Sequence, residues 1–288
     1  MYAVNYRSTM VDGIRIAYRE AGDSKAPSLL LLHGFPSAGH MFRDLIPLLS
    51  EKFYLIAPDM PGFGQSDMPS PTTFKYSFEN LARIIDGFLD AIHMRSYSMY
   101  VFDYGAPVGF RLALKHPENI QFIISQNGNA YEEGLNDSWS SLRSYWASPT
   151  DEYRESLRSA FSVEAIRSQY LQGVPDENFV SPDGSCLDSY YLTRPGAHEP
   201  QLDLFRDYGS NVALYPAFHE YFRMYKPSLL AVWGKNDPYL IPAGAEAFRR
   251  DLSDVEVRFL NTGHFALETH SKEIADAIRE FFDAEIRI

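Results

Sequence analysis

The chain has 288 residues, of which 45% are hydrophobic and 22% charged, a composition typical of a globular protein that buries a core. Its formal net charge of −12 makes nucleic acid and anionic membrane surfaces poor partners, because an acidic surface repels phosphate groups. The single cysteine, Cys186, excludes an internal disulfide, and neither a signal peptide nor an 18-residue apolar run is found. We therefore expect a cytoplasmic protein.

Strand-like and helix-like segments alternate over the first 130 residues, which favours a parallel sheet covered by helices on both faces. In chain order we expect strands at 13–21, 28–32, 53–57, 97–102 and 121–125, and helices at 41–49, 78–92 and 107–115. Helical segments then dominate, until strands return at 228–233 and 255–260 and a last helix follows at 272–284. We predict an α/β core formed by 1–128 and 226–288, with a helical cap, or lid, inserted at 129–225.

The strongest chemical signal lies at the end of the buried strand expected at 97–102. Asp103 stands between this strand and the next helix, and Gly105 and Ala106 are small enough to allow a sharp turn there. A carboxylate in this position is ionised at neutral pH and can attack an electrophilic carbon without a base. Asp103 could also merely cap the helix, and Val101 replaces the first glycine of the usual turn. The companion motifs favour a nucleophile.

A second motif, His33-Gly34-Phe35-Pro36, follows the buried strand expected at 28–32. Tight backbone here would direct the N–H of Phe35 towards the N–H of Tyr104, and two such donors would stabilise a negatively charged oxygen. We expect His33 to shape this loop, although an ordinary turn is the alternative. The Gly/Pro loop at 59–67 lacks G-x-G-x-x-G spacing and a P-loop lysine, which argues against nucleotide binding.

Two further residues follow the strands that return near the C-terminus. Asp237 follows the first of these strands and His264 the second, so the chain order is Asp103, Asp237, His264, or nucleophile, acid and histidine. His264 would activate the water that hydrolyses an ester, and Asp237 would orient its ring. Glu132 or Glu133 is an alternative acid. No Cys/His cluster indicates a metal, and we expect no cofactor.

Together these segments resemble the epoxide hydrolase and haloalkane dehalogenase branch of the α/β-hydrolases. The resemblance rests on SLLLLHGFPSAGHMFRDLIPLLS, APDMPGFGQSD, YVFDYGAPVGFRLALKHPE, VWGKNDP and NTGHFALE, spans nearly the whole chain, and is weakest in the inserted segment. It implies an α/β-hydrolase fold with a mostly parallel central sheet flanked by helices and an inserted helical cap. It also implies hydrolysis through an ester formed on Asp103.

The two branches of this family differ in what assists the leaving group. In epoxide hydrolases two cap tyrosines donate hydrogen bonds to the epoxide oxygen, so the resemblance predicts two such tyrosines here. Tyr208 is the first candidate, because it precedes the 228–233 strand by a distance like that of the family's second tyrosine. Tyr145 is the candidate for the other tyrosine, and the remaining possibilities are Tyr131, Tyr191 and Tyr215.

Dehalogenases instead bind the halide with N–H donors, typically from a tryptophan directly after the nucleophile, where this chain has Tyr104. Relatives that act on haloacetates carry an arginine pair near the nucleophile, and the DYGAPVG turn contains none. We therefore expect water to open a small, apolar epoxide to a vicinal diol. Three alternatives stay open: a haloalkane dehalogenase, an esterase or lactonase, and a non-catalytic ligand-binding protein. The second is disfavoured because an aspartate attacking an acyl carbon would give an anhydride.

Overall fold

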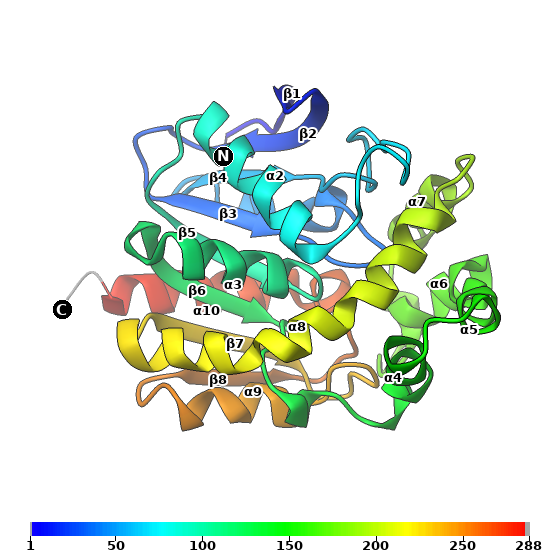
Figure 1. Cartoon of the computed structure of the whole chain (residues 1–288). Helices are drawn as coiled ribbons and strands as arrows, with labels where there is room; N and C mark the ends of the chain where they lie inside the picture. The colour runs from blue at the N-terminus through cyan, green and yellow to red at the C-terminus, as the bar shows by residue number, and fades with distance from the viewer. Residues whose placement is uncertain (1, 286–288) are drawn as a thin grey trace.

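The computed structural model describes residues 2–285, and an eight-stranded sheet forms its centre (Figure 1). The strand order is β1-β2-β4-β3-β5-β6-β7-β8; β2 pairs antiparallel with β1 and β4, and every later pair is parallel. The mostly parallel sheet expected from the sequence is thus confirmed. The strands are β1 (Asn5–Val11), β2 (Ile14–Ala21), β3 (Ser28–Leu32), β4 (Tyr54–Pro58), β5 (Tyr97–Phe102), β6 (Ile120–Gln126), β7 (Ser228–Gly234) and β8 (Glu256–Leu260).

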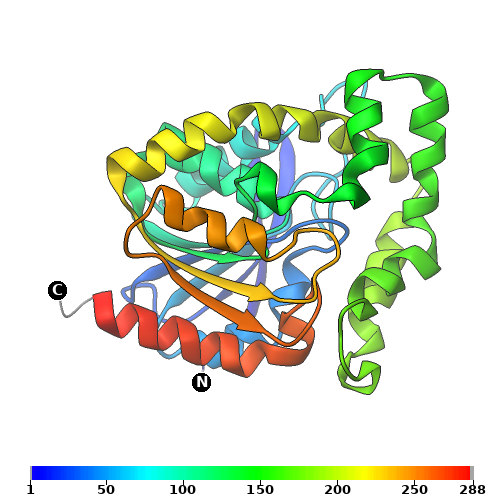
Figure 2. The same ribbon diagram turned by 90° about the horizontal axis from the view of Figure 1, so that it is seen from below.

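Helices cover both faces of the sheet and bury two separate hydrophobic clusters. In Figure 2, α10 lies along one face, whereas α3 and the long helix α8 lie on the other. The α-helices are α1 (Leu45–Leu49), α2 (Phe78–Ala91), α3 (Gly105–Lys115), α4 (Ser140–Ala147), α5 (Asp151–Ser156), α6 (Val163–Leu171), α7 (Pro182–Leu192), α8 (His198–Tyr225), α9 (Ala243–Ala247) and α10 (Leu267–Glu285).

The central strands and α2 follow directly from local sequence. All six residues of β5 are buried, as expected of a parallel strand with helices on both faces. Helix α2 begins after Ser77, whose side chain accepts a hydrogen bond from the backbone N–H of Asn80 and so caps the first turn. Its buried residues recur at helical spacing, which is why the sequence predicted this helix to within one residue at its end.

Several elements differ from the sequence prediction: α9 was not predicted, α10 begins at Leu267 and not at 272, and two further differences have clear local causes. Strand β1 was not predicted, because it is an edge strand whose side chains are mostly exposed and show no apolar alternation. The helix expected at 41–49 is broken into a 3-10 turn at Gly39–Phe42 and the short helix α1. Pro47 explains this break, since proline is tolerated only in the first turn of a helix and α1 therefore begins just before it.

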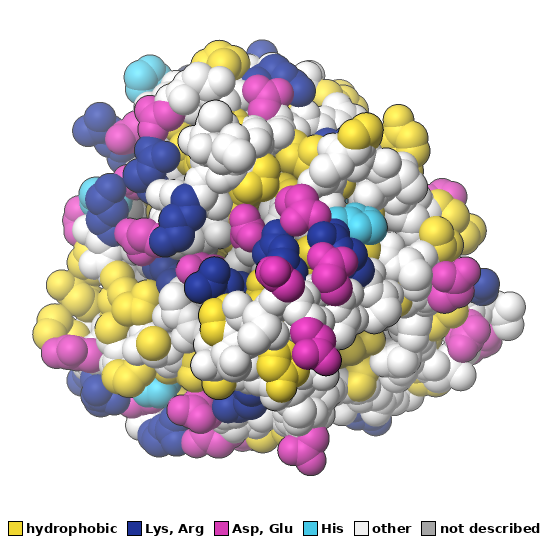
Figure 3. All heavy atoms as spheres, turned by 45° about the vertical axis from the view of Figure 1, so that its right-hand side comes forward, with side chains coloured by type: hydrophobic (Ala, Val, Ile, Leu, Met, Phe, Trp, Pro, Cys, Tyr) yellow, Lys and Arg dark blue, Asp and Glu magenta, His cyan; other side chains and the backbone are white. Residues whose placement is uncertain are grey.

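The segment between β6 and β7 is helical, as expected, and α4 to α7 lie at one end of the sheet (Figure 1). Helix α8 runs from this group back along the core, where the rings of Phe218 and Phe222 both lie 5.4 Å from the ring of Phe110 on α3. The 129–225 boundaries of the cap stay a prediction. Acidic and basic side chains are intermixed on the face that carries these helices (Figure 3).

Candidate active site

Asp103 lies in a strained turn between β5 and α3. Its φ of 47° is in the left-handed region, which non-glycine residues seldom adopt. A Cβ atom at Gly105 would lie 2.2 Å from the carbonyl oxygen of Leu32, so only glycine allows the helix to approach β3 this closely. The departure from the usual turn at Val101 is accommodated by Gly109, since a Cβ there would lie 2.7 Å from the valine Cγ1. The fold thus holds the Asp103 carboxylate beyond the end of β5.

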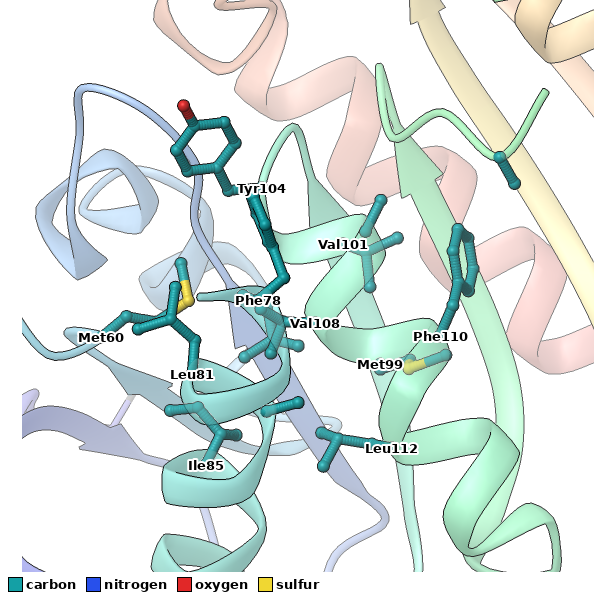
Figure 4. Close-up of a cluster of buried hydrophobic side chains, with 14 of the residues drawn as sticks. Met60, Phe78, Leu81, Ile85, Met99, Val101, Tyr104, Val108, Phe110 and Leu112 are labelled. Carbon is teal, nitrogen blue, oxygen red and sulfur yellow. The ribbon is translucent and has the colours of Figure 1, made fainter. Parts of the chain in front are cut away.

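Two backbone N–H groups bind this carboxylate. The N–H of Phe35 donates to Oδ1 of Asp103 at 2.7 Å, and the backbone N–H of Tyr104 also donates to the carboxylate. Gly34 makes the approach possible, because a Cβ at this position would lie 2.4 Å from the same Oδ1. The Tyr104 ring packs 4.9 Å from Phe78 within the hydrophobic cluster drawn in Figure 4, and this packing fixes the turn that presents its N–H. The two predicted oxyanion donors therefore meet at the Asp103 carboxylate.

His33 lies beneath this loop and does not reach the carboxylate. Its Nε2 accepts a hydrogen bond from the N–H of Met60 at 3.0 Å, and its Nδ1 lies 3.3 Å from the carbonyl oxygen of Gly34. Burial lowers the pKa of His33 to about 3, so the ring is neutral. As expected from the sequence, it shapes the loop.

His264 and Asp237 lie together at the ends of β8 and β7. The Nδ1 of His264 donates to Oδ2 of Asp237 at 2.7 Å, while its Nε2 faces Oδ2 of Asp103 at 3.9 Å. The other oxygen of Asp237 accepts hydrogen bonds from the backbone N–H groups of Tyr239 and Leu240. His264 and Asp237 are both buried. This geometry orients the imidazole with one nitrogen towards the nucleophile candidate.

The sequence analysis missed Asn127, which follows β6 with a φ of 46°. Its side-chain amide donates to Oδ2 of Asp237 at 2.6 Å and accepts hydrogen bonds from Gln126 and from the backbone N–H of Gly234. The Gln126 amide also donates to the backbone carbonyl of His264 at 3.0 Å. Two adjacent amide residues at the end of a buried parallel strand were the available signal.

The alternative acids lie elsewhere. Glu132 and Glu133 are exposed, and Glu133 forms an ion pair with Arg250. Asp237, not either glutamate, therefore faces the imidazole of His264.

Burial is the largest single influence on the pKa values of Asp103 and His264, but its outcome differs between them. It raises the pKa of Asp103, an effect only partly opposed by His264 and by the N–H groups of Phe35 and Tyr104. Burial lowers the pKa of His264, but the charge and hydrogen bond of Asp237 and the charge of Asp103 together raise it above its ordinary value. Such shifts in facing groups are typical of catalytic sites.

A cavity of about 230 Å³ opens above Asp103 and is mostly apolar. Core residues form its floor, and residues of the inserted helical segment form its roof. The lining residues are Phe35, Asp103, Tyr104, Ser138, Trp139, Ser141, Leu142, Leu157, Ala160, Gln169, Phe205, Tyr208, Tyr239 and His264. A larger depression of about 900 Å³ lies beside α4 and α8, but it contains none of the predicted catalytic residues.

The structure separates the two cap tyrosine candidates. Tyr208 lines the cavity, is buried, and has its hydroxyl hydrogen-bonded to that of Tyr215. Tyr145 is buried but does not line this cavity, and its hydroxyl instead accepts a hydrogen bond from Arg154 at 3.3 Å. The sequence could not separate them, because the direction of a cap side chain depends on how the cap helices pack.

The remaining tyrosine alternatives also lie outside the cavity lining. The hydroxyl of Tyr131 donates to Asp251, and Tyr191 packs 6.4 Å from the ring of His40. Tyr215 lies behind Tyr208 and accepts a hydrogen bond from Asn129 at 3.2 Å.

All three tryptophans of the chain lie within residues 2–285, and each indole N–H is already bound to a backbone carbonyl. Trp139 donates to Tyr239, Trp146 to Phe205 and Trp233 to Leu240, each at 2.7 Å. No indole N–H in this part of the chain is therefore left to bind a halide. Across the same residues, no group of three or more His, Cys, Asp or Glu side chains is placed to hold a metal ion.

The fold and site define an α/β-hydrolase, and comparison with known proteins agrees. Residues 27–271 match the model of a family described as alpha/beta hydrolase fold, and the chain belongs to this family. It is 46% identical over 275 residues to an uncharacterized hydrolase of Saccharomyces cerevisiae, covering 94% of each protein. It is also 23% identical over 289 residues to Epoxide hydrolase 2 of Caenorhabditis elegans, covering 96% of this chain and 79% of the relative.

The solved structures show the same fold. The crystal structure of haloalkane dehalogenase DbeA from Bradyrhizobium elkani matches with a TM-score of 0.83 at 22% identity and covers 99% of both chains. The resemblance and the α/β-hydrolase fold expected from the sequence are thus confirmed. No helix in the described part of the chain is long and apolar enough to cross a membrane.

Proposed function

We propose that this hydrolase opens small epoxides to vicinal diols through an ester on Asp103. The observation that supports this proposal is that the two carboxylate oxygens of Asp103 have different surroundings. Oδ1 is held by the N–H of Phe35, whereas Oδ2 is free of that donor and faces the His264 ring at 3.9 Å. One oxygen is thus ready to become an ester carbonyl, and the other is ready to attack.

In the first step, Oδ2 of Asp103 attacks an epoxide carbon and the carbon–oxygen bond of the ring breaks. The electron pair moves to the epoxide oxygen, which takes a proton from the Tyr208 hydroxyl. Burial raises the pKa of Tyr208 well above its ordinary value, so the hydroxyl keeps its proton until an alkoxide forms. The Asp103 carboxylate needs no base for this step.

Asn129 and Tyr215 support this proton donation. The Asn129 amide donates to the Tyr215 oxygen and also to the carbonyl oxygen of Tyr131 at 2.7 Å, which fixes the direction of the amide. The Tyr215 proton can then be donated to Tyr208, whose own proton points to the epoxide. This arrangement requires the two hydroxyls to turn, so that Tyr215 donates to Tyr208 during the reaction, and a phenolate formed on Tyr208 would then be stabilised by this hydrogen bond.

In the second step, His264 takes a proton from a water molecule that attacks the ester carbonyl of Asp103. The negative charge that develops on Oδ1 is stabilised by the N–H groups of Phe35 and Tyr104. Asp237 stabilises the imidazolium. Cleavage of the ester breaks the bond between the Asp103 carbonyl carbon and Oδ2. Oδ2 leaves on the substrate as an alkoxide and takes the second proton of the added water, which gives the diol and leaves the water oxygen in the regenerated carboxylate. The proton held by His264 returns the Tyr208 phenolate to its neutral form through solvent. Water thus supplies both added hydrogens and replaces the Asp103 oxygen that leaves in the diol.

The cavity limits the size of the substrate. A cavity of about 150 Å³ holds benzene, so by proportion the 230 Å³ here accommodates about nine non-hydrogen atoms. Its mostly aromatic and aliphatic lining favours an apolar body on the substrate.

Haloalkane dehalogenation is the second candidate, because the same carboxylate, histidine and acid could displace a halide, and because a dehalogenase shares the fold. The engaged indole N–H groups argue against it, whereas the buried Tyr208 hydroxyl favours an epoxide. Incubation with a panel of small epoxides and haloalkanes separates the two. We expect diol without halide, and Asp103→Asn should abolish it. Halide release would contradict the epoxide proposal and favour haloalkane dehalogenation. The absence of both products would favour a different substrate or a binding role.

A further inference from the structure

The cavity wall contains one side-chain amide, and the proposed chemistry does not use it. Gln169 lies on α6, lines the cavity above Asp103 and is half-buried. Within residues 2–285 its side-chain amide has no hydrogen-bond partner. An amide left in a mostly apolar wall loses part of its hydration without gaining a partner, which is unfavourable unless a ligand supplies one.

Apart from the Tyr104 hydroxyl, the other polar groups of the wall are engaged or exposed to solvent. Asp103 is held by backbone N–H groups, and the exposed Ser141 side chain lies at the rim, where solvent reaches it. The remaining hydrogen bonds stay within the protein: His264 with Asp237, Tyr208 with Tyr215, Tyr239 with Gln172 and Ser138 with Asn136. Gln169 therefore offers a donor and an acceptor to whatever fills the cavity.

We propose that Gln169 forms a polar subsite that binds a neutral hydrogen-bonding group, such as a hydroxyl, on the substrate. This inference rests on the proposed function and assigns the class of substrate: a small epoxide with an apolar body and a hydroxyl or carbonyl outside the ring. Gln169 lies on α6 and Asp103 at the end of β5, and the chain length that joins the polar group to the ring is what the test below measures.

The charge of the cavity excludes an ionic group at this subsite. No Lys or Arg is among the lining residues, so a carboxylate would be buried beside the Asp103 carboxylate without a cation. An ammonium group would meet no carboxylate in the lining other than that of Asp103, which the reaction uses. The Gln169 amide can donate and accept, and this suits a hydroxyl, which does both.

The test uses ω-hydroxy epoxides of increasing chain length, each paired with the alkyl epoxide in which a methyl group replaces the hydroxyl. The pairs have the same size, so their ratio of kcat/KM isolates the polar group. We expect the wild-type protein to favour the hydroxy epoxide by about tenfold at the chain length that reaches Gln169. Gln169→Met, which keeps the length of the side chain, should bring the ratio of kcat/KM within each pair close to one, whatever the variant's rate on the alkyl epoxide.

Ser168→Ala is the matched control, since Ser168 lies next to Gln169 on α6 but its hydroxyl binds Gln172 and does not line the cavity. It should keep the wild-type preference. An unchanged ratio in Gln169→Met at every chain length would overturn the subsite and leave the proposed epoxide hydrolysis intact.

Binding to the inactive Asp103→Asn variant tests the subsite without turnover. Calorimetry should show about tenfold tighter binding of the hydroxy member, lost when Gln169→Met is added. If the wild-type protein hydrolyses no epoxide but this binding difference is found, the proposed reaction fails and the subsite stands. Equal binding of both members with and without Gln169→Met overturns the subsite.

Discussion

The Nε2 atom of His264 lies 3.9 Å from Oδ2 of Asp103, beyond hydrogen-bonding distance, although both side chains are buried. The opposite nitrogen of the ring is anchored to Asp237 at 2.7 Å. The imidazole therefore faces the carboxylate without occupying the oxygen that would attack a substrate. This separation suits a base that acts on the ester rather than on the nucleophile.

The charges around His264 predict a change in its pKa during the reaction. The Asp103 charge helps to raise the pKa of His264 in the free protein, and alkylation would remove that charge. The pKa of His264 should then fall, so that the ring becomes a neutral base when the ester must be hydrolysed. Asp103→Asn mimics the loss of charge, and NMR titration of the ring should give a lower pKa than in the wild-type protein. An equal or higher pKa would contradict this explanation.

The same shifts predict the pH dependence of each step. Burial raises the pKa of Asp103, and only the ionised carboxylate attacks, so alkylation should slow as pH falls and do so at a higher pH than for an exposed aspartate. Hydrolysis needs neutral His264 and should speed up as pH rises through the pKa of that ring. Single-turnover kinetics over a pH series would resolve the two steps. Alkylation that is insensitive to acid would argue against an ionised Asp103 nucleophile.

The positions of the two cap tyrosines predict unequal effects of removing their hydroxyls. Tyr208→Phe should slow epoxide opening by about a hundredfold or more, the usual contribution of a general acid. Tyr145→Phe should leave the rate within about twofold, because its hydroxyl binds Arg154 outside the cavity. Rates of ester formation, measured by rapid quenching, provide the comparison. A larger loss in Tyr145→Phe than in Tyr208→Phe would reverse this assignment.

Residues 170–173 of the inserted segment bind both loops that carry the base and its acid. The Tyr170 ring stacks on Phe265 at 3.9 Å, and the Asn236 amide donates to the carbonyl oxygen of Gly173 at 2.8 Å. Asn236→Ala should loosen the loop that carries Asp237 and slow ester hydrolysis about fivefold, with little change in ester formation.

Asn178→Ala is the control for this variant, since Asn178 is an exposed asparagine of the same segment whose amide binds only Asp176 among the described residues. It should hydrolyse the ester at the wild-type rate. Equal slowing of both steps in Asn236→Ala would indicate general destabilisation instead of positioning.

Much of the core could be predicted because its signals are local. The uninterrupted apolar residues of β3 and β5 and the helical spacing in α2 mark buried elements whatever the rest of the chain does. Asp103 was identifiable because it directly follows such a strand. His264 was identifiable because it lies in the loop after a later strand, and parallel strands bring their carboxyl ends to one edge.

The roof of the cavity could not be predicted, because its residues are placed by contacts between distant segments and not by local sequence. Tyr208 and Tyr145 are both buried tyrosines on helices, and only the packing of α4 against α8 decides which hydroxyl reaches the cavity. Asn127 and Gln169 were missed because a single amide has no characteristic spacing. The cytoplasmic location and the catalytic roles stay predictions that experiments must test.

The most direct test of the central claim is the mass of the Asp103 peptide after incubation of His264→Gln with a small epoxide. Loss of the base should block hydrolysis but not attack, so the peptide should gain the full mass of the epoxide, and Asp103→Asn should gain none. A His264→Gln protein that binds the epoxide but leaves the Asp103 peptide unmodified would contradict the ester mechanism.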